Sequence, residues 1–242
     1  MANRYIYRIN PKEVDFSLRA TIISLCDYIL QTAGEDADKN GFGTRNLRTD
    51  NLTWVLSRMA VEIIRFPNQY EEIIIETWVE DIGKIYTTRN FNIYDARQRL
   101  IGHACTYWAI INISTRSVQD ILQYPTYTKC IEPTACPIAK PGKILPVKSE
   151  HPVDSHTVRY TDIDFNQHSN STKYIGWMLD SLPIGHFLEN DIQRLDINFL
   201  HESVYGTNIH IYRSLDETNT VFTLKRESGE MVCNAKISWK KK

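Results

Sequence analysis

The hexapeptide RMAVEI at residues 58–63 returns 136 positions later as RLDINF at residues 194–199. Large apolar side chains recur at every second position in both copies, which is the pattern of a half-buried antiparallel strand. The same register continues without a gap into a second strand-like run, with matching isoleucines at Ile73, Ile75, Ile209 and Ile211. Self-similarity at a fixed spacing predicts one structural unit used twice in tandem.

A second match, at an offset of 149, lies upstream of the first. Asp15 and Phe16 meet Asp164 and Phe165, and the apolar positions of a helix-like run follow in both copies. Because 149 − 136 = 13, the first half carries a 13-residue insertion, which we place near residues 35–52, a polar, glycine-bearing stretch that predicts a loop. Each half is therefore predicted to be α+β, with an antiparallel sheet wrapped around a central helix.

The prolines predict how the halves are joined. Six of the nine fall between residues 125 and 152, where they disfavour helix interiors and central strands. The predicted organisation is an N-terminal domain over residues 1–124, a Pro-rich linker over 125–152 and a C-terminal domain over 153–242.

Composition argues against several classes of protein. The 28 Lys and Arg balance 29 Asp and Glu, so the chain lacks the basic excess of a nucleic-acid-binding protein. No apolar run approaches the roughly 20 residues of a membrane span, and the first residues lack the apolar segment of a secretion signal. Five cysteines without a C-x-x-C pair argue against disulfides and a zinc site. We expect a cytoplasmic protein that binds no metal and needs no cofactor.

Three polar residues stand two apart just before the second helix-like run: Asp164, Asn166 and His168. Alternate side chains of an extended chain share one face, and the adjoining helix N-terminus suits a developing oxyanion. The corresponding positions of the first half, which offer neither a neutral base nor an amide, are Asp15, Ser17 and Arg19. Because Asp and Asn before a helix are commonly caps, and because the first half shares the aspartate, Asp164 is also open to a purely structural interpretation.

Glu202 is a further candidate, because the aligned residue of the first half is Phe66. A carboxylate in the place of a phenyl ring suggests a function. A solvated glutamate at the end of a strand explains the residue equally well.

The run DFNQHSNSTKYIGW at residues 164–177 resembles the signature of the acyl-acyl carrier protein thioesterases, the plant-type family with bacterial members. In the first half, NGFG at residues 40–43, LTWVLSRM at 52–59 and TWV at 77–79 resemble the same family. The resemblance covers nearly the whole chain. It implies two tandem hot-dog domains and hydrolysis of a fatty acyl thioester to a free fatty acid, with an acyl carrier protein as the partner.

Carried over position by position, the family's active-site Asp, Asn and His fall on Asp164, Asn166 and His168, and its downstream Glu falls on Glu202. Family members often have Cys after that Glu, whereas this chain has Ser203, so thiolate attack is unavailable there and we favour attack by water. In this hypothesis Glu202 is the general base and Asn166 holds the water or the carbonyl. His168, oriented by Asp164, polarises the thioester or assists the leaving thiolate.

The surroundings of the substrate follow from the same resemblance. Helix N-terminal amides near Ser169 and Asn170 are expected to stabilise the oxyanion. The first domain is expected to bind the acyl tail, with candidate lining residues on a predicted helical face and on strands: Leu18, Ile22, Cys26, Ile29, Leu30, Trp54, Met59 and Trp78. An acidic carrier protein favours a basic patch, with the candidates Arg45, Arg48, Lys140, Lys143, Lys148 and Lys173.

Three other functions stay open. An acyl-CoA thioesterase uses the same pantetheine arm, and a dehydratase or hydratase is also compatible with the fold. The placement of Asn166 and Glu202 favours hydrolysis over the latter. A non-catalytic acyl-binding protein is the third alternative, which the intact polar set of the second half disfavours. Both a monomer and a homodimer are compatible with the sequence.

Overall fold

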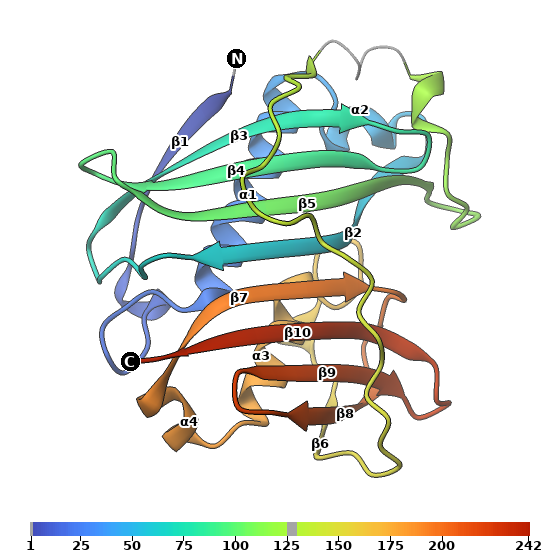
Figure 1. The fold of residues 1–242 in the computed structure, drawn as a ribbon. Coiled ribbons are helices and arrows are strands. Elements are labelled where there is room, and N and C mark those ends of the chain that lie inside the picture. Colours follow the sequence, from blue (N-terminus) through green and yellow to red (C-terminus); the bar gives the residue numbers. More distant parts are fainter. Residues whose placement is uncertain (1, 125–129) are drawn as a thin grey trace. The chain divides into compact units, whose positions relative to one another are not determined.

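The computed structural model describes residues 2–124 and 130–242, and the chain divides into two compact units, Met1–Pro141 and Gly142–Lys242 (Figure 1). This boundary lies inside the predicted linker, whose residues 125–129 are outside the described residues. Each unit contains an antiparallel sheet and a central helix, so the predicted α+β class is confirmed.

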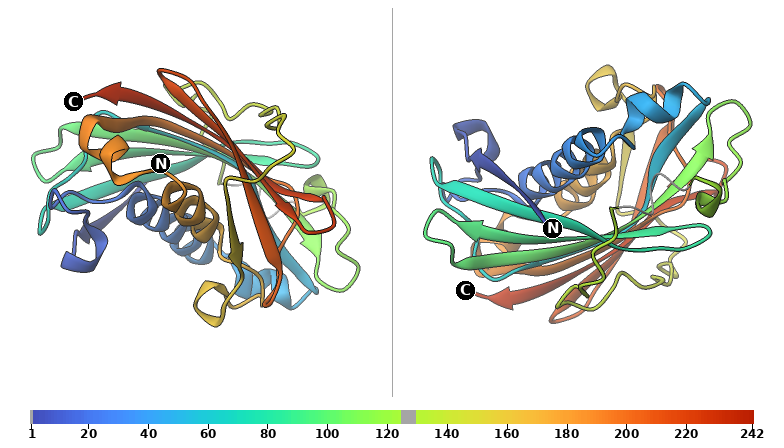
Figure 2. Two further views of the ribbon diagram at one scale, coloured as in Figure 1. Left: turned by 90° about the horizontal axis from the view of Figure 1, so that it is seen from below. Right: turned by 90° about the horizontal axis from the view of Figure 1, so that it is seen from above.

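In the first unit the strands lie in the order β1-β3-β4-β5-β2, each antiparallel to its neighbours. Figure 2 shows α1 against one face of this sheet. The elements in chain order are β1 (Asn3–Arg8), η1 (Pro11–Glu13), α1 (Ile22–Lys39), α2 (Thr44–Arg48), β2 (Leu52–Ile63), β3 (Glu72–Ile82), β4 (Thr87–Asp95), β5 (Leu100–Asn112) and η2 (Ile121–Gln123).

The second unit repeats this order as β6-β8-β9-β10-β7, again with antiparallel neighbours. Its elements are β6 (Asp154–Thr157), η4 (Tyr160–Asp162), α3 (Ser171–Asp180), α4 (Ile184–Glu189), β7 (Asn190–Phe199), β8 (Asn208–Leu215), β9 (Asn219–Arg226) and β10 (Met231–Lys241). The two units therefore share one topology, as the internal repeat predicts.

The central helices begin at equivalent residues because equivalent residues cap them. Thr21 accepts a hydrogen bond from the N–H of Ser24 at 3.1 Å at the start of α1. Asn170, which lies 149 positions later, caps α3 by accepting from the N–H of Thr172 at 3.0 Å. A side-chain acceptor at this position satisfies one of the unpaired N–H groups of the first helical turn. The predicted offset of 149 is thus confirmed at the helix starts.

Two details of the sequence-based prediction were wrong. Leu18 is exposed and precedes α1, with φ of 59°, so it is not on the predicted helical face. The stretch 35–52 is not simply a loop, because α1 continues to Lys39 and α2 follows after a short turn. Gly41, with φ of 80°, ends α1 in the left-handed conformation that glycine adopts readily.

Residues 132–152 of the Pro-rich segment form no helix or strand and are bonded to the sheet of each unit. In the first unit, Cys136 and Ile138 pack against Ala60 and Cys105 on the sheet face opposite α1. In the second unit, backbone N–H groups of the segment donate to sheet side chains, at 2.9 Å from Ile144 to Asn198 and at 2.9 Å from Val147 to Thr223. Side chains of the sheet thereby satisfy backbone groups that a Pro-rich chain cannot pair in a ladder.

Candidate active site

The segment before α3 is a tight turn whose shape is set by Asp164. One carboxylate oxygen of Asp164 accepts from the backbone N–H of Asn166 at 2.7 Å and of His168 at 3.3 Å. The N–H of Asp164 donates to the carbonyl of His168 at 2.8 Å, and Gln167 between them has φ of 66°. Asp164 therefore positions His168 through the backbone. Asn166 lies in the same turn and is partly buried.

The first unit contains the same turn. Asp15 accepts from the N–H groups of Ser17 at 2.8 Å and Arg19 at 3.3 Å, and its own N–H donates to the Arg19 carbonyl at 2.8 Å. Leu18 has φ of 59°, matching Gln167 of the second unit. The turn and its aspartate thus belong to the fold of both units, and the side chains they present are what differ.

Glu202 follows the end of β7 and reaches the imidazole of His168. Its Oε2 lies 3.4 Å from His168 Nε2, the distance of an ion pair or a long hydrogen bond. The His168 side chain is 24% exposed and that of Glu202 is 39% exposed, so solvent reaches the pair. A carboxylate beside an imidazole provides the groups that general acid–base chemistry requires.

Two contacts hold the loops that carry this pair. The N–H of Ser169 donates to the carbonyl of Ser203 at 2.7 Å, which joins the residues immediately after His168 and Glu202. The guanidinium of Arg226 donates to the carbonyl of Glu202. Sequence comparison between the halves did not indicate this arginine, because it bonds to backbone rather than to another side chain of the motif.

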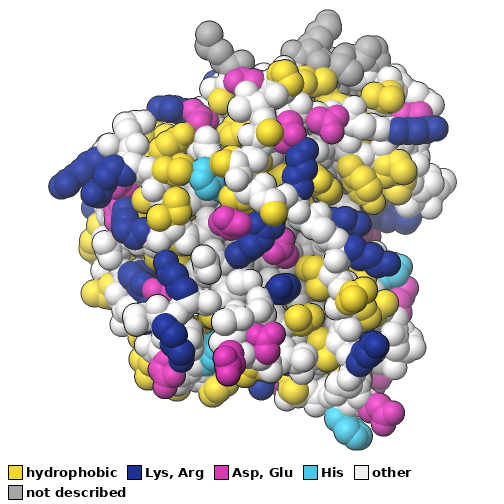
Figure 3. All heavy atoms as spheres, viewed as in Figure 1, with side chains coloured by type: hydrophobic (Ala, Val, Ile, Leu, Met, Phe, Trp, Pro, Cys, Tyr) yellow, Lys and Arg dark blue, Asp and Glu magenta, His cyan; other side chains and the backbone are white. Residues whose placement is uncertain are grey.

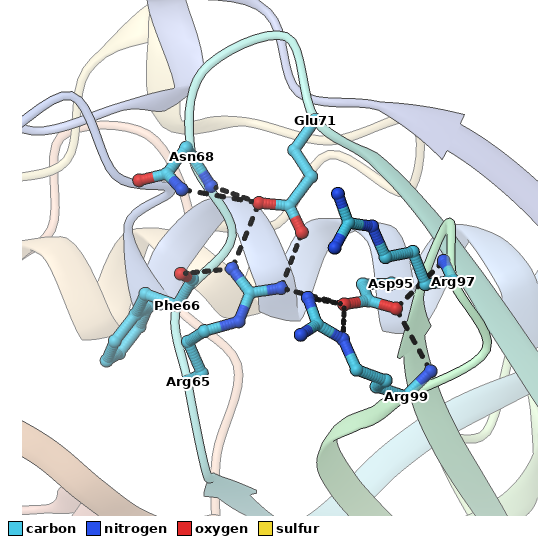
Figure 4. Close-up of polar contacts among 7 residues, drawn as sticks. All are labelled: Arg65, Phe66, Asn68, Glu71, Asp95, Arg97 and Arg99. Atoms are coloured by element: carbon cyan, nitrogen blue, oxygen red, sulfur yellow. Dashed lines mark hydrogen bonds and ion pairs between the residues drawn. The ribbon is translucent and has the colours of Figure 1, made fainter.

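The corresponding corner of the first unit is an ion cluster without a carboxylate at the position of Glu202 (Figure 4). Phe66 occupies that position. Arg65 lies 2.5 Å from Glu71 and 3.4 Å from Asp95, and donates to the carbonyl of Phe66 at 3.3 Å. In this corner of the first unit charged groups hold the loops together, and a phenyl ring lies where the second unit has the carboxylate of Glu202.

The amides of Ser169 and Asn170 were wrongly predicted as oxyanion donors. The N–H of Ser169 donates to the Ser203 carbonyl at 2.7 Å, and that of Asn170 donates to the Asp162 carbonyl at 2.8 Å. A backbone N–H that already has a carbonyl partner is not available to a developing charge. Both acceptors are backbone carbonyls, so no residue type in the sequence signals them.

The predicted acyl-binding residues all belong to the first unit, and three of them lie on the α1 side of its sheet. Ile29 on α1 and Met59 on β2 are fully buried. Trp54, also on β2, is partly buried beside the apolar cluster at the end of α1, and its indole N–H donates to the carbonyl of Phe42 at 2.8 Å.

Trp78 lies on the opposite face of this sheet. Its neighbour Thr77 accepts from Arg89, whose guanidinium pairs at 2.6 Å with Asp36 of α1, so Thr77 faces the helix and Trp78 faces away. The indole N–H of Trp78 donates to the carbonyl of Thr134 at 2.6 Å in the extended segment. The sheet separates Trp78 from Ile29, Met59 and Trp54.

Two family models match most of the chain. The acyl-ACP thioesterase N-terminal domain matches residues 3–126, and the acyl-ACP thioesterase C-terminal domain matches residues 147–241. The chain belongs to the acyl-ACP thioesterase family. The resemblance that the sequence motifs indicated is thus confirmed for both halves of the chain.

Known proteins agree with this assignment. An acyl-ACP thioesterase from Bacteroides thetaiotaomicron VPI-5482 is 36% identical, with a TM-score of 0.90 over 99% of this chain and 98% of that one. The 12:0-ACP thioesterase from Umbellularia californica, at 19% identity, shares the fold with a TM-score of 0.90 over 100% and 98% of the two chains. These structures confirm the predicted hot-dog fold.

Curated plant relatives are longer. The chloroplastic oleoyl-acyl carrier protein thioesterase of Coriandrum sativum is 28% identical over 207 residues, which cover 78% of this chain and 56% of that protein. The chain described here thus spans little more than half the length of this relative. Within residues 2–124 and 130–242, no helix has the length and apolar character to cross a membrane, and no three His, Cys, Asp or Glu residues group into a metal site.

Proposed function

We propose that the chain hydrolyses the thioester of a fatty acyl-acyl carrier protein, releasing a free fatty acid and the carrier's phosphopantetheine thiol. The observation that carries this proposal is the contact between His168 and Glu202, 3.4 Å apart and open to solvent, in the half that carries the family's motif. The proposal also rests on membership of the acyl-ACP thioesterase family.

In the proposed mechanism Glu202 takes a proton from a water molecule as that water attacks the thioester carbon. Asn166 holds the water or the carbonyl oxygen. His168 polarises the thioester or assists departure of the thiolate, which leaves with the electrons of the carbon–sulfur bond and is protonated to the thiol. Asp164 is a positioning residue, because it fixes the turn that presents Asn166 and His168.

Thiol-release kinetics with an acyl carrier protein substrate test these roles. Glu202→Gln and His168→Ala are each expected to lower kcat at least about a hundredfold while the protein stays folded, because general base catalysis contributes roughly 10²–10⁴. Ser203→Ala is expected to lower kcat much less than either of these substitutions, because Ser203 is not the nucleophile of this mechanism and the loss of a nucleophile would cost at least as much as they do. Near-normal turnover of Glu202→Gln would contradict the mechanism.

A matched control is Glu71→Gln, which alters a carboxylate in the corresponding corner of the first unit. Glu71 pairs with Arg65 at 2.5 Å, so its loss is expected to lower Tm without changing kcat.

Comparing one acyl group on the carrier protein and on CoA in the same assay distinguishes an acyl-ACP from an acyl-CoA thioesterase. Faster hydrolysis of the CoA ester would contradict the proposed donor.

We propose the domain roles in the same terms. Residues 1–124 bind the acyl chain, through Ile29, Met59 and Trp54, and residues 153–242 carry out catalysis. Support comes from burial of these apolar side chains on one sheet face of the first unit and from its lack of a base at Phe66.

Docking of the carrier protein is proposed to use basic side chains. Lys140 is paired with Glu80 at 2.6 Å and Lys173 lies 3.8 Å from Asp162, which offsets their charge and favours Arg45, Lys143 and Lys148. On the face seen in Figure 3 basic and acidic side chains are interspersed. A cytoplasmic location is proposed as well, supported by five cysteines that are all free thiols.

A further inference from the structure

Three buried hydroxyl groups adjoin the His168–Glu202 pair in the sequence and the fold of the second unit. Ser169 follows His168, Ser203 follows Glu202, and Tyr174 lies in the first turn of α3. Their exposed fractions are 7% for Ser169, 0% for Ser203 and 3% for Tyr174. None of the three hydroxyl oxygens has a hydrogen-bond partner outside these three residues within the described part of the chain. Buried polar groups are normally satisfied, so three hydroxyls that have only one another as neighbours call for a functional explanation.

The three hydroxyls belong together. Burial raises the pKa of Tyr174, and the nearby hydroxyls of Ser203 and Ser169 act in the opposite direction by stabilising its phenolate. We call Ser169, Tyr174 and Ser203 the hydroxyl cluster. Tyr174 is its shared member, since it is near both serines.

The first unit shows that the fold does not require the hydroxyl cluster. The backbone hydrogen bond between Ser169 and Ser203 has an equivalent in the first unit, where the N–H of Ala20 donates to the carbonyl of Pro67 at 2.8 Å. The residues at the three equivalent positions carry no hydroxyl: Ala20, Leu25 and Pro67. The hydroxyl cluster is therefore present in the copy with His168 and Glu202 and absent from the copy with Arg19 and Phe66.

The imidazole of His168 also has a buried polar atom without a hydrogen-bond partner among the described residues. Its Nδ1 is buried and has no hydrogen-bond partner among the described residues, while its Nε2 faces Glu202 Oε2 at 3.4 Å. When the proton of a neutral imidazole is on Nε2, Nδ1 is an acceptor and needs a donor. Hydroxyl groups are donors, and one of them, on Ser169, is on the adjacent residue.

We propose that the hydroxyl cluster supplies the hydrogen-bond donor for His168 Nδ1 through one bridging water, and that Tyr174 is a positioning residue of the reaction. The cluster thereby holds the imidazole in the tautomer whose Nε2–H points to Glu202. This inference rests on the proposed function, in which His168 acts at the thioester. The partner of the second ring nitrogen generally decides which tautomer a histidine adopts.

A double-mutant cycle on the full chain tests this role, with a fatty acyl-acyl carrier protein as substrate. Tyr174→Phe is expected to lower kcat at least about tenfold with KM within about twofold, because a histidine held in the wrong tautomer loses turnover. In a His168→Ala background the same substitution is expected to change kcat less than about twofold, because its effect is exerted through the imidazole. If the loss of kcat in the double variant equals the product of the losses in the two single variants, the inference is overturned.

The control is Tyr28→Phe in α1. The Tyr28 hydroxyl donates to Glu13 at 2.6 Å and to the Arg8 carbonyl at 3.1 Å, so its loss removes a buried hydroxyl that has partners. We expect a lower Tm and an unchanged kcat. If Tyr28→Phe lowers kcat as much as Tyr174→Phe, the effect of Tyr174→Phe on kcat comes from a general loss of protein stability, and the inference fails.

Nitrogen-15 chemical shifts of His168 give a second test that needs no variant to fold. The wild-type protein is expected to show the Nε2-protonated neutral imidazole, and an Nδ1-protonated form would overturn the inference. The two proposals fail separately. Normal turnover of His168→Ala contradicts the proposed function, whereas loss of turnover in His168→Ala with normal kcat in Tyr174→Phe contradicts only the role of the hydroxyl cluster.

Discussion

Asp15 and Asp164 make the same hydrogen bonds in two copies of one turn, yet only the second copy presents an imidazole. Each carboxylate accepts from two backbone N–H groups, an arrangement typical of residues that shape turns. Sequence comparison indicated this structural role, because the aspartate is shared by both halves while the residues that follow it are not.

Replacing these two aspartates separates structure from catalysis. Asp15→Ala and Asp164→Ala are each expected to destabilise the protein by about 0.5–1.5 kcal/mol, because two backbone N–H groups of each turn lose their acceptor. Only Asp164→Ala is expected to lower kcat as well, because its turn holds His168. Thermal unfolding and thiol-release assays on both variants check this, and equal turnover of the two would contradict a positioning role for Asp164.

The residues that sequence could not assign are those whose partners are backbone atoms or distant in the chain. Ser169 and Asn170 were plausible oxyanion donors until the carbonyls of Ser203 and Asp162 were found to occupy their N–H groups. Trp78 looked equivalent to Trp54, but one faces away from α1 and the other packs beside the end of that helix. A pattern of apolar residues predicts a strand without showing which face a given ring adopts.

At the scale of elements, the offset of 149 between the two copies predicted equivalent helix starts, but the segment after the first helix was assigned wrongly. The insertion was predicted as a loop from its glycines, whereas these glycines end α1 and precede α2. Gly43 has a steric reason to be there, because a Cβ would lie 2.6 Å from the Cα of Asp38. Glycines therefore marked a tight helix–helix connection rather than a long loop.

Asp95, at the end of β4 in the hairpin to β5, is expected to make the stability of the fold depend on pH. Burial would raise the pKa of Asp95, but donation from the backbone and side chain of Arg99 and the backbone of Arg97 outweighs it and lowers the pKa from 3.8 to about 2. A carboxyl whose folded-state pKa is lowered stabilises the fold fully above its unfolded pKa, and this contribution is lost as the pH falls through the folded value.

Asp95→Asn is therefore expected to have a lower Tm than the wild type at pH 5–7. The difference in Tm is expected to narrow below about pH 4 and to be mostly lost around pH 2, where about half of Asp95 in the folded wild type is protonated. Calorimetry of both proteins across this range measures it. A difference in Tm that stays constant down to pH 2 would contradict the lowered pKa.

At the scale of the whole chain, the prolines predicted a linker but not its attachment to the sheets. Asn198 shows how attachment works in the second unit: its side chain accepts from the N–H of Ile144 and donates to the carbonyl of Gly142, both at 2.9 Å. Asn198 is on β7 and is buried. Composition cannot indicate such contacts, since they depend on a sheet face assembled from distant strands.

Asn198→Ala tests this attachment. Loss of both hydrogen bonds is expected to reduce the free energy of unfolding by about 1–3 kcal/mol, because two backbone groups of the segment lose their partner. Limited proteolysis is expected to cut the variant faster within residues 142–152 than the wild type. Unchanged cleavage in this segment would show that other contacts hold it.

Having both turns in one polypeptide has an evolutionary consequence. In an enzyme assembled from two identical subunits, every substitution appears twice, so an imidazole gained for chemistry would also be introduced where the partner copy binds its ligand. Here a single codon encodes Arg19 and a different codon encodes His168. Each turn can therefore change by mutation on its own, so an imidazole at one turn leaves the side chains of the other unaltered.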